Sequence, residues 1–151
     1  MLASIGLTAC GGDNHAGHSE DPVAGQHAAE EQKWDEVMVV HDEVMPKMSE
    51  INRISRALRQ KLEEDNSLPA DLRQQAEAAV QQLTDAEEGM WEWMNNIRQL
   101  DALRESKNHE EIIQYLNDEQ SRINEVRDAM LKSIETGDQL LQQIHSDHGE
   151  Q

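Results

Sequence analysis

The chain contains no Phe, one Tyr and one Cys among its 151 residues. Strands favour aromatic and β-branched side chains, so an aromatic β-core is not expected. A single Cys excludes an internal disulfide framework and any CxxC zinc or redox site. After residue 12, no stretch has the roughly 18 consecutive apolar residues that a membrane-spanning helix needs. These absences leave a core of aliphatic side chains and Met.

Basic residues are also scarce, with 13 Lys and Arg against 31 Asp and Glu, which gives a formal net charge of -18. This excess of negative charge repels nucleic-acid phosphates and anionic lipid head groups. We therefore expect neither nucleic-acid binding nor direct electrostatic docking to a membrane. The charge favours solubility, attraction of cations, or a partner with a basic surface. Adjacent acidic pairs such as Glu30-Glu31 are expected on solvated helix faces.

The amino-terminal residues 1–9, MLASIGLTA, are apolar and small, and a cysteine follows them directly. Leu7-Thr8-Ala9-Cys10 resembles the lipobox of bacterial lipoproteins, in which the leader is cut before a Cys whose thiol is joined to diacylglycerol. The resemblance implies a periplasm-facing protein anchored to a membrane by lipid on Cys10. The basic region and most of the apolar segment of such leaders are missing, so the natural start can lie upstream. The alternative is a chance cysteine in a frayed apolar end.

Residues 10–29 are rich in Gly, His, Asp and Ala and have no apolar periodicity. This composition predicts a flexible, lipidated tether. Imidazole is a common metal ligand, but isolated histidines on a mobile linker (His15, His18 and His27) bind weakly. A solvated spacer is the preferred interpretation.

From Glu30 onward, apolar residues recur at alternating steps of three and four, which is typical of helices that bury one stripe. We predict an all-α fold with helices over about 30–63, 69–104 and 109–145, followed by a polar tail at 146–151. Short connections favour an antiparallel, up-down-up three-helix bundle of coiled-coil-like character. Pro69 suits the first turn of a helix, and Asn108 with Glu111 has capping-box spacing.

The first predicted helix has a core series with one weak position, Ser55. The series is Trp34, Val37, Met38, His41, Val44, Met45, Met48, Ile51, Leu58 and Leu62. Pro46 lies inside this helix and lacks the N–H that would bond the Asp42 carbonyl. The sequence therefore predicts a kink at Pro46.

One layer of the predicted bundle is rich in soft side chains. Folding the first two helices about a connection near residue 65 pairs positions whose numbers sum to roughly 131, so His41 would lie level with Met90. The neighbourhood would contain Met38, His41, Met45, Met90, Trp93 and Met94. Imidazole and thioether ligands suit Cu(I) or a haem iron, although haem needs a larger cavity. Plain packing is the preferred alternative, because Met fills irregular core gaps and His41 can bond Asp42 or the backbone.

Catalytic motifs are not found elsewhere in the chain. The stretch HEEII at 109–113 carries Ile113 where the zincin motif requires its second histidine. There is no GxSxG, no GxxxxGK[ST], no EF-hand loop and no Glu-x-x-His pair of the di-iron bundles. The sequence therefore gives no support for an enzyme or for a resident cofactor.

Three blocks of sequence resemble a known family. They are HDEVMPKMSEI at 41–51, DAEEGMWEWMNN at 85–96 and YLNDEQSRINEVRDAMLKSIE at 115–135. They look like a family of small bacterial helical lipoproteins labelled "viral A-type inclusion protein". The resemblance implies a cell-envelope lipoprotein with a helical domain and no particular activity or ligand.

Two classes of function follow. The first is a non-catalytic envelope module that presents helical faces to a protein partner or to a second copy of itself. The second is a periplasmic protein that handles Cu(I) through His41 with Met38, Met45, Met90 or Met94.

Overall fold

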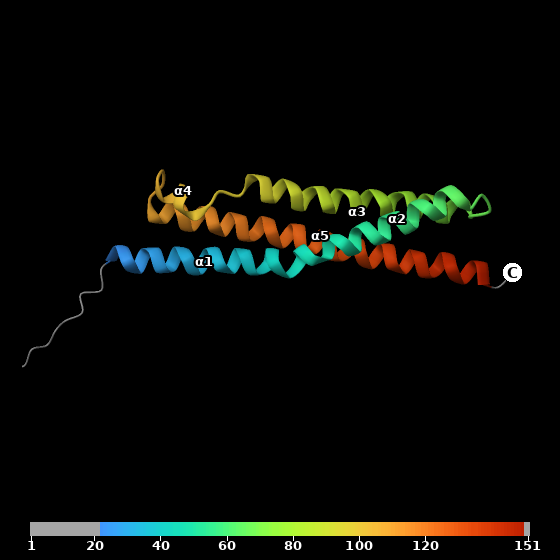
Figure 1. Cartoon of the computed structure of the whole chain (residues 1–151), viewed down its shortest axis with the longest axis horizontal. Helices are drawn as coiled ribbons and strands as arrows, with labels where there is room; N and C mark the ends of the chain where they lie inside the picture. The colour runs from blue at the N-terminus through green and yellow to red at the C-terminus, as the bar shows by residue number, and fades with distance from the viewer. Residues whose placement is uncertain (1–21, 150–151) are drawn as a thin grey trace, which may run out of the picture.

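A computed structural model describes residues 22–149, with side chains as far as residue 146 (Figure 1). The elements are α1 (Pro22–Val44), the 3₁₀ helix η1 (Met45–Lys47), α2 (Met48–Glu64), α3 (Ala70–Asn96), α4 (Leu100–Arg104) and α5 (His109–Gly149). Residues 22–149 contain no strand, which confirms the all-α prediction for this part of the chain. None of the described helices combines the length and apolar character needed to cross a membrane.

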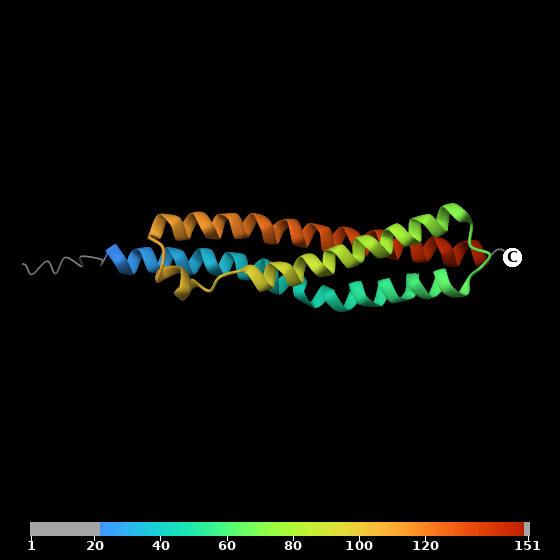
Figure 2. The same ribbon diagram turned by 90° about the horizontal axis from the view of Figure 1, so that it is seen from above.

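The long helices lie lengthwise and give an elongated molecule (Figures 1 and 2). The start of α1 lies at the same end as α4 and the start of α5, whereas the connection between α2 and α3 lies at the opposite end. Helix α5 packs against α1, α2, α3 and α4 in turn. This one helix therefore joins the two ends of the fold.

The first predicted helix is interrupted at the predicted place. Helix α1 ends at Val44, and the turn that contains Pro46 is 3₁₀ before α2 begins at Met48. Proline removes the N–H that would continue the α-helical ladder and its ring crowds the preceding turn. The predicted kink at Pro46 is confirmed.

The start of the first helix differs from the sequence prediction. Helix α1 begins at Pro22, so residues 22–29, expected as part of the tether, are helical. Proline is well suited to the first helical position, because it has no N–H there to leave unsatisfied. The Arg104 guanidinium also donates a hydrogen bond of 3.1 Å to the His27 carbonyl. A contact from a distant part of the chain thus stabilises a turn that lacks apolar periodicity.

The second predicted helix is shorter than expected. Helix α3 ends at Asn96, and Ile97 and Gln99 have extended backbones before the short α4. The Arg98 N–H donates to the Tyr115 hydroxyl at 2.8 Å instead of continuing the helix. Ile97 and Leu100 pack against buried residues on either side of the break. The apolar periodicity of the sequence therefore continues although the helix does not.

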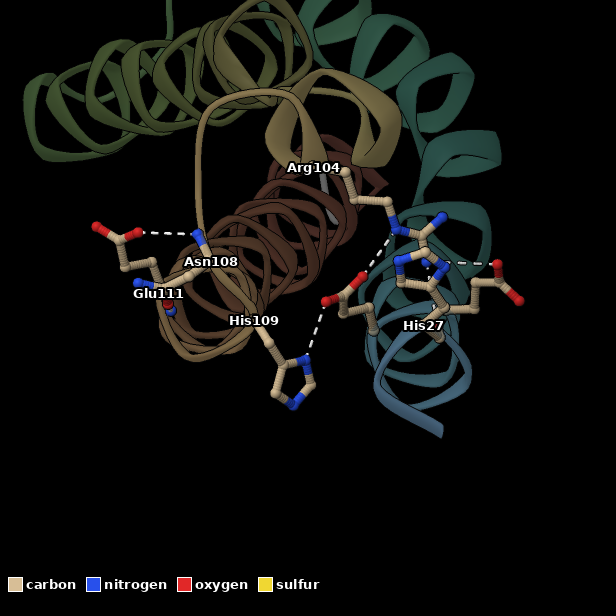
Figure 3. A network of polar contacts seen from close by, with 7 residues as sticks. His27, Arg104, Asn108, His109 and Glu111 are labelled. Atoms are coloured by element: carbon tan, nitrogen blue, oxygen red, sulfur yellow. Dashed lines mark hydrogen bonds and ion pairs between the residues drawn. The ribbon is translucent and has the colours of Figure 1, made fainter. Parts of the chain in front are cut away.

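The start of α5 matches the predicted capping box. The Asn108 side-chain oxygen accepts from the Glu111 N–H at 3.0 Å, and the Glu111 carboxylate accepts from the Asn108 N–H at 2.9 Å (Figure 3). The two bonds satisfy N–H groups that the first turn of a helix leaves free. The helix continues to Gly149, beyond the predicted end at 145.

The buried side chains form two clusters. The main core runs from Val37 in α1 through α2, α3 and most of α5. The second core, beside α4, consists of Leu103, Ile112 and Leu116, with Trp34, Leu100 and Tyr115 packed around it.

Ser55, the weak position of the predicted series, is not a core residue. Its neighbour Ile54 faces the core instead and has no exposed surface. A β-carbon at Gly137 of α5 would lie 2.5 Å from the Ile54 Cγ2 atom. The absence of a side chain at Gly137 therefore lets α2 approach α5 closely.

Candidate functional site

The predicted lipidation motif lies outside the described residues. Leu7, Thr8, Ala9 and Cys10 all precede residue 22, where the described structure begins. The lipid anchor on Cys10 therefore stays a prediction.

His41 lies in the last turn of α1, just before the break at Pro46, and its side chain is 15% exposed. The His41 Nδ1 atom lies 2.8 Å from the Asp42 Oδ1 atom. An ionised carboxylate only accepts hydrogen bonds, so the Nδ1 atom is the donor. Asp42 therefore fixes the orientation of the ring.

The other side of the His41 ring faces α3. The His41 Nε2 atom lies 3.4 Å from the Met94 sulfur, and the ring stacks on Trp93 with centroids 5.6 Å apart and an angle of 29° between the planes. Trp93 is 6% exposed, and its indole N–H has no hydrogen-bond partner. The predicted meeting of His41 with the Met and Trp block is thus present in the structure.

The predicted register was wrong by one helical turn, because Met94 and not Met90 supplies the sulfur at the His41 ring. Two features account for the shift. The connection between α2 and α3 covers residues 65–69, so its centre lies later than assumed. The 3₁₀ segment also rises about 2.0 Å per residue against about 1.5 Å in an α-helix, which lengthens the first arm.

The remaining methionines of the predicted layer lie in or against the main core. Met90 is completely buried, and Met38 and Met45 are half-buried and pack against the core cluster. Among the described residues, no group of three or more His, Cys, Asp or Glu side chains is placed to hold a metal ion. The polar contacts of the His41 ring are with the Asp42 carboxylate and the Met94 thioether.

A second polar site lies at the end of the molecule where α1 begins. Glu30 is 2% exposed and accepts a hydrogen bond from Arg104 Nε at 2.7 Å and one from His109 Nδ1 at 2.9 Å. Arg104 also approaches the Glu31 carboxylate, at 3.4 Å. Figure 3 shows Arg104 and His109 reaching this carboxylate network from α4 and α5. The Glu30 network therefore ties α1 to both of these helices.

Opposing effects set the charge of Glu30. Burial is the largest single effect and raises the pKa of its carboxyl. The hydrogen bonds and the electrostatic attraction from Arg104 and His109 together outweigh burial, so the pKa lies below the usual value of 4.5. The bond to Glu30 in turn raises the pKa of Arg104. The pair is therefore ionised at neutral pH.

A comparison with protein families, curated proteins and solved structures found no match to this chain. The resemblance to the helical lipoproteins stays a prediction, and the two sites are interpreted from their own geometry.

The Glu30 network was not predicted from the sequence. Glu30 was expected on a solvated face, and the structure shows that this is wrong because the carboxylate is buried. One signal was present: Glu30 lies four residues before Trp34 and seven before Val37, so it continues the buried stripe. Its partners Arg104 and His109 lie more than 70 residues away, and no local pattern connects them to it.

Proposed function

We propose that the protein is a non-catalytic helical module of the bacterial cell envelope, anchored by lipid on Cys10 and built as an antiparallel up-down-up three-helix bundle. In this proposal it stands off the membrane and presents its acidic surface to an envelope protein, or apolar residues of its helical faces to a second copy of itself. The observation that most supports this proposal is the elongated shape of the fold. Helix α5 alone has 41 residues, which corresponds to a length of about 60 Å.

The direction of the chain supports this proposal. The start of α1 lies at one end of the molecule, and the connection between α2 and α3 lies at the other (Figure 2). An anchor attached before α1 would therefore place that connection far from the membrane. Buried side chains are almost all apolar, and the buried polar exceptions among the described residues are Glu30, Glu119 and Ser133. This composition suits a rigid spacer.

The Glu30 network also supports a tethered module. It holds the third turn of α1, at Glu30, to α4 and α5, in the helix that the tether would enter. A buried carboxylate with two charge-assisted or polar partners resists separation more than an exposed pair does. Tension on the tether would therefore act on a helix that is held at Glu30.

The surface charge favours a basic partner. The formal net charge of -18 creates a field that accelerates association with positively charged surfaces and depends on ionic strength. The exposed apolar residues Val39, Trp91 and Leu131 lie on α1, α3 and α5 respectively. They are points at which helical faces can add apolar contacts to an electrostatic encounter.

The anchor is tested by fatty-acid labelling of the protein expressed from its natural gene with its natural leader. We expect Cys10→Ser to abolish the label and release the protein from the membrane fraction. The control is the circular dichroism of Cys10→Ser, which should match that of the wild type. Unchanged labelling in Cys10→Ser would refute the anchor. Light scattering of the released protein then measures self-association independently of the anchor.

A further inference from the structure

The contact between His41 Nε2 and the Met94 sulfur depends on which ring nitrogen carries the proton. With the proton on Nδ1, the neutral ring directs a lone pair from Nε2 towards the Met94 sulfur, 3.4 Å away. A thioether has no hydrogen to donate, so two acceptors face each other. Such a pair is stabilised when a cation, either a proton or a soft metal ion, lies between the two atoms.

We propose that His41 Nε2 and Met94 Sδ bind one soft monovalent metal ion, Cu(I) or its chemical analogue Ag(I), with Asp42 as the positioning residue. This inference goes beyond the proposed envelope module and does not depend on it. Imidazole and thioether ligands prefer soft ions over hard ones such as Mg²⁺ and Ca²⁺.

Asp42 has the position expected of an outer partner in a histidine metal site. Histidine ligands usually donate the N–H of the second nitrogen to a carboxylate or carbonyl, which fixes the tautomer and orients the ring. The 2.8 Å contact between His41 Nδ1 and Asp42 Oδ1 meets this requirement. Asp42 is 74% exposed, so its carboxylate is available to the ring without a burial cost of its own.

The separation of the two ligand atoms is compatible with one ion between them. With metal–nitrogen and metal–sulfur distances of about 2.0 and 2.3 Å, a 3.4 Å separation corresponds to a ligand angle of roughly 105°. This angle is close to tetrahedral and leaves room for a third ligand. Met38 and Met45 lie one turn to either side of His41 on the same arm, and both are half-buried.

The surroundings favour a soft cation further. Trp93 stacks on the His41 ring, limits access of water, and offers an aromatic surface of the kind that attracts cations. The described residues contain no cluster of three His, Cys, Asp or Glu side chains for a zinc ion. The competing occupant is a proton, which would turn Nε2 into a donor to the Met94 sulfur and leave a purely structural contact.

The test is an Ag(I) titration of the full chain in a Cys10→Ser background, because a free thiol would itself bind a soft ion. Calorimetry and native mass spectrometry measure affinity and stoichiometry, and ¹⁵N spectra of the histidine rings report the state of Nε2. We expect one Ag(I) per chain and a shift of the His41 Nε2 signal. Met94→Leu, which keeps the volume and removes the sulfur, should weaken binding by about tenfold or more.

Matched variants separate the roles. Met130→Leu changes a fully buried methionine of α5 and should leave affinity unchanged. His15→Ala with His18→Ala should also have no effect. Asp42→Asn should weaken binding by about tenfold and alter the His41 tautomer in the ¹⁵N spectrum. The proposal would be overturned if Met94→Leu bound Ag(I) as tightly as the parent protein. It would also be overturned if His41 Nε2 were protonated and its ¹⁵N signal did not change on addition of Ag(I). Circular dichroism confirms that each variant is folded.

Discussion

The two ends of the molecule bury their helices in different ways. Where α2, α3 and α5 meet, the contacts are apolar and tight, and Gly137 brings α5 close to Ile54 of α2. Where α1, α4 and α5 meet, a small apolar cluster is supplemented by the buried Glu30 network. A long apolar core supplies most of the burial that stabilises the fold, whereas a buried ion pair adds the requirement that its charged partners meet. We therefore expect the first end to determine overall stability and the second to determine where α1 starts.

The strongest test of this difference compares two buried leucines. Leu83 and Leu103 have no exposed surface, and they lie in the main and the second core respectively. Leu83→Ala should lower the free energy of unfolding by about 3 to 4 kcal/mol, through lost burial and a residual cavity. Leu103→Ala should cost about 2 to 3 kcal/mol, because the small second core can collapse further.

The location of the effect matters as much as its size. Urea denaturation gives the total loss, and hydrogen exchange shows where protection falls. Leu83→Ala should reduce protection along α2, α3 and α5, and Leu103→Ala mainly in α1 and α4. The same global pattern in both variants would contradict the division into two ends.

The next largest effect concerns the Glu30 network. Glu30→Gln keeps the shape but removes the charge that faces Arg104 and His109. We expect a loss of about 2 kcal/mol in the free energy of unfolding, the scale of hydrogen bonds to charged groups. Glu31→Gln is the control, because Glu31 is 63% exposed and only 3.4 Å from Arg104 at its closest. Its effect should stay below about 0.5 kcal/mol.

The contribution of Glu30 should also depend on pH. Its folded pKa lies below its usual value of 4.5. Its stabilisation is therefore complete above that value and is lost as the pH falls through the folded pKa. Wild type and Glu30→Gln should differ most near neutral pH and converge as the pH falls below 4.5 and through the folded pKa. A constant difference across this range would mean that the charge of Glu30 is not what stabilises α1.

A smaller effect comes from two glycines that lie inside helices. A β-carbon at Gly137 would lie 2.5 Å from Ile54 Cγ2, whereas one at Gly89 would meet nothing within 4 Å. Gly89→Ala should stabilise the protein by up to about 1 kcal/mol through helix propensity alone. Gly137→Ala gains the same propensity, but overpacking should leave a net loss of about 1 kcal/mol. Thermal melting of both variants measures the difference, and equal shifts would exclude a close approach at Gly137.

The smallest effect is expected on the outer face of α3. Trp91 is 50% exposed and Trp93 is 6% exposed, although they are two residues apart. Trp91→Gln should change the free energy of unfolding by less than about 0.5 kcal/mol, as exposed substitutions do. If Trp91→Gln lowers self-association or partner binding without changing stability, this residue belongs to an interaction surface. A large loss of stability would place Trp91 in the core.

Much of the fold follows from local patterns. The helical periodicity, the break at Pro46 and the Asn108–Glu111 capping box depend on residues a few positions apart, and all three are present in the structure. The predicted helix boundaries at residues 30 and 104 were wrong, because α1 begins at Pro22 and α3 ends at Asn96. Near these ends, Arg104 bonds the His27 carbonyl and Tyr115 bonds the Arg98 N–H. Local propensity is a weak guide where a distant side chain supplies the deciding hydrogen bond.

The sequence by itself determined the all-α class, the break at Pro46 and the capping box at the start of α5. It also indicated that His41 lies near the Met and Trp block. Only the tertiary structure decided that Met94 faces His41 and that Glu30 is buried between Arg104 and His109. The physical reason is the range of each effect. Periodicity and capping act over three or four residues, whereas register along two packed helices depends on the length of the connection and on every change of rise before it.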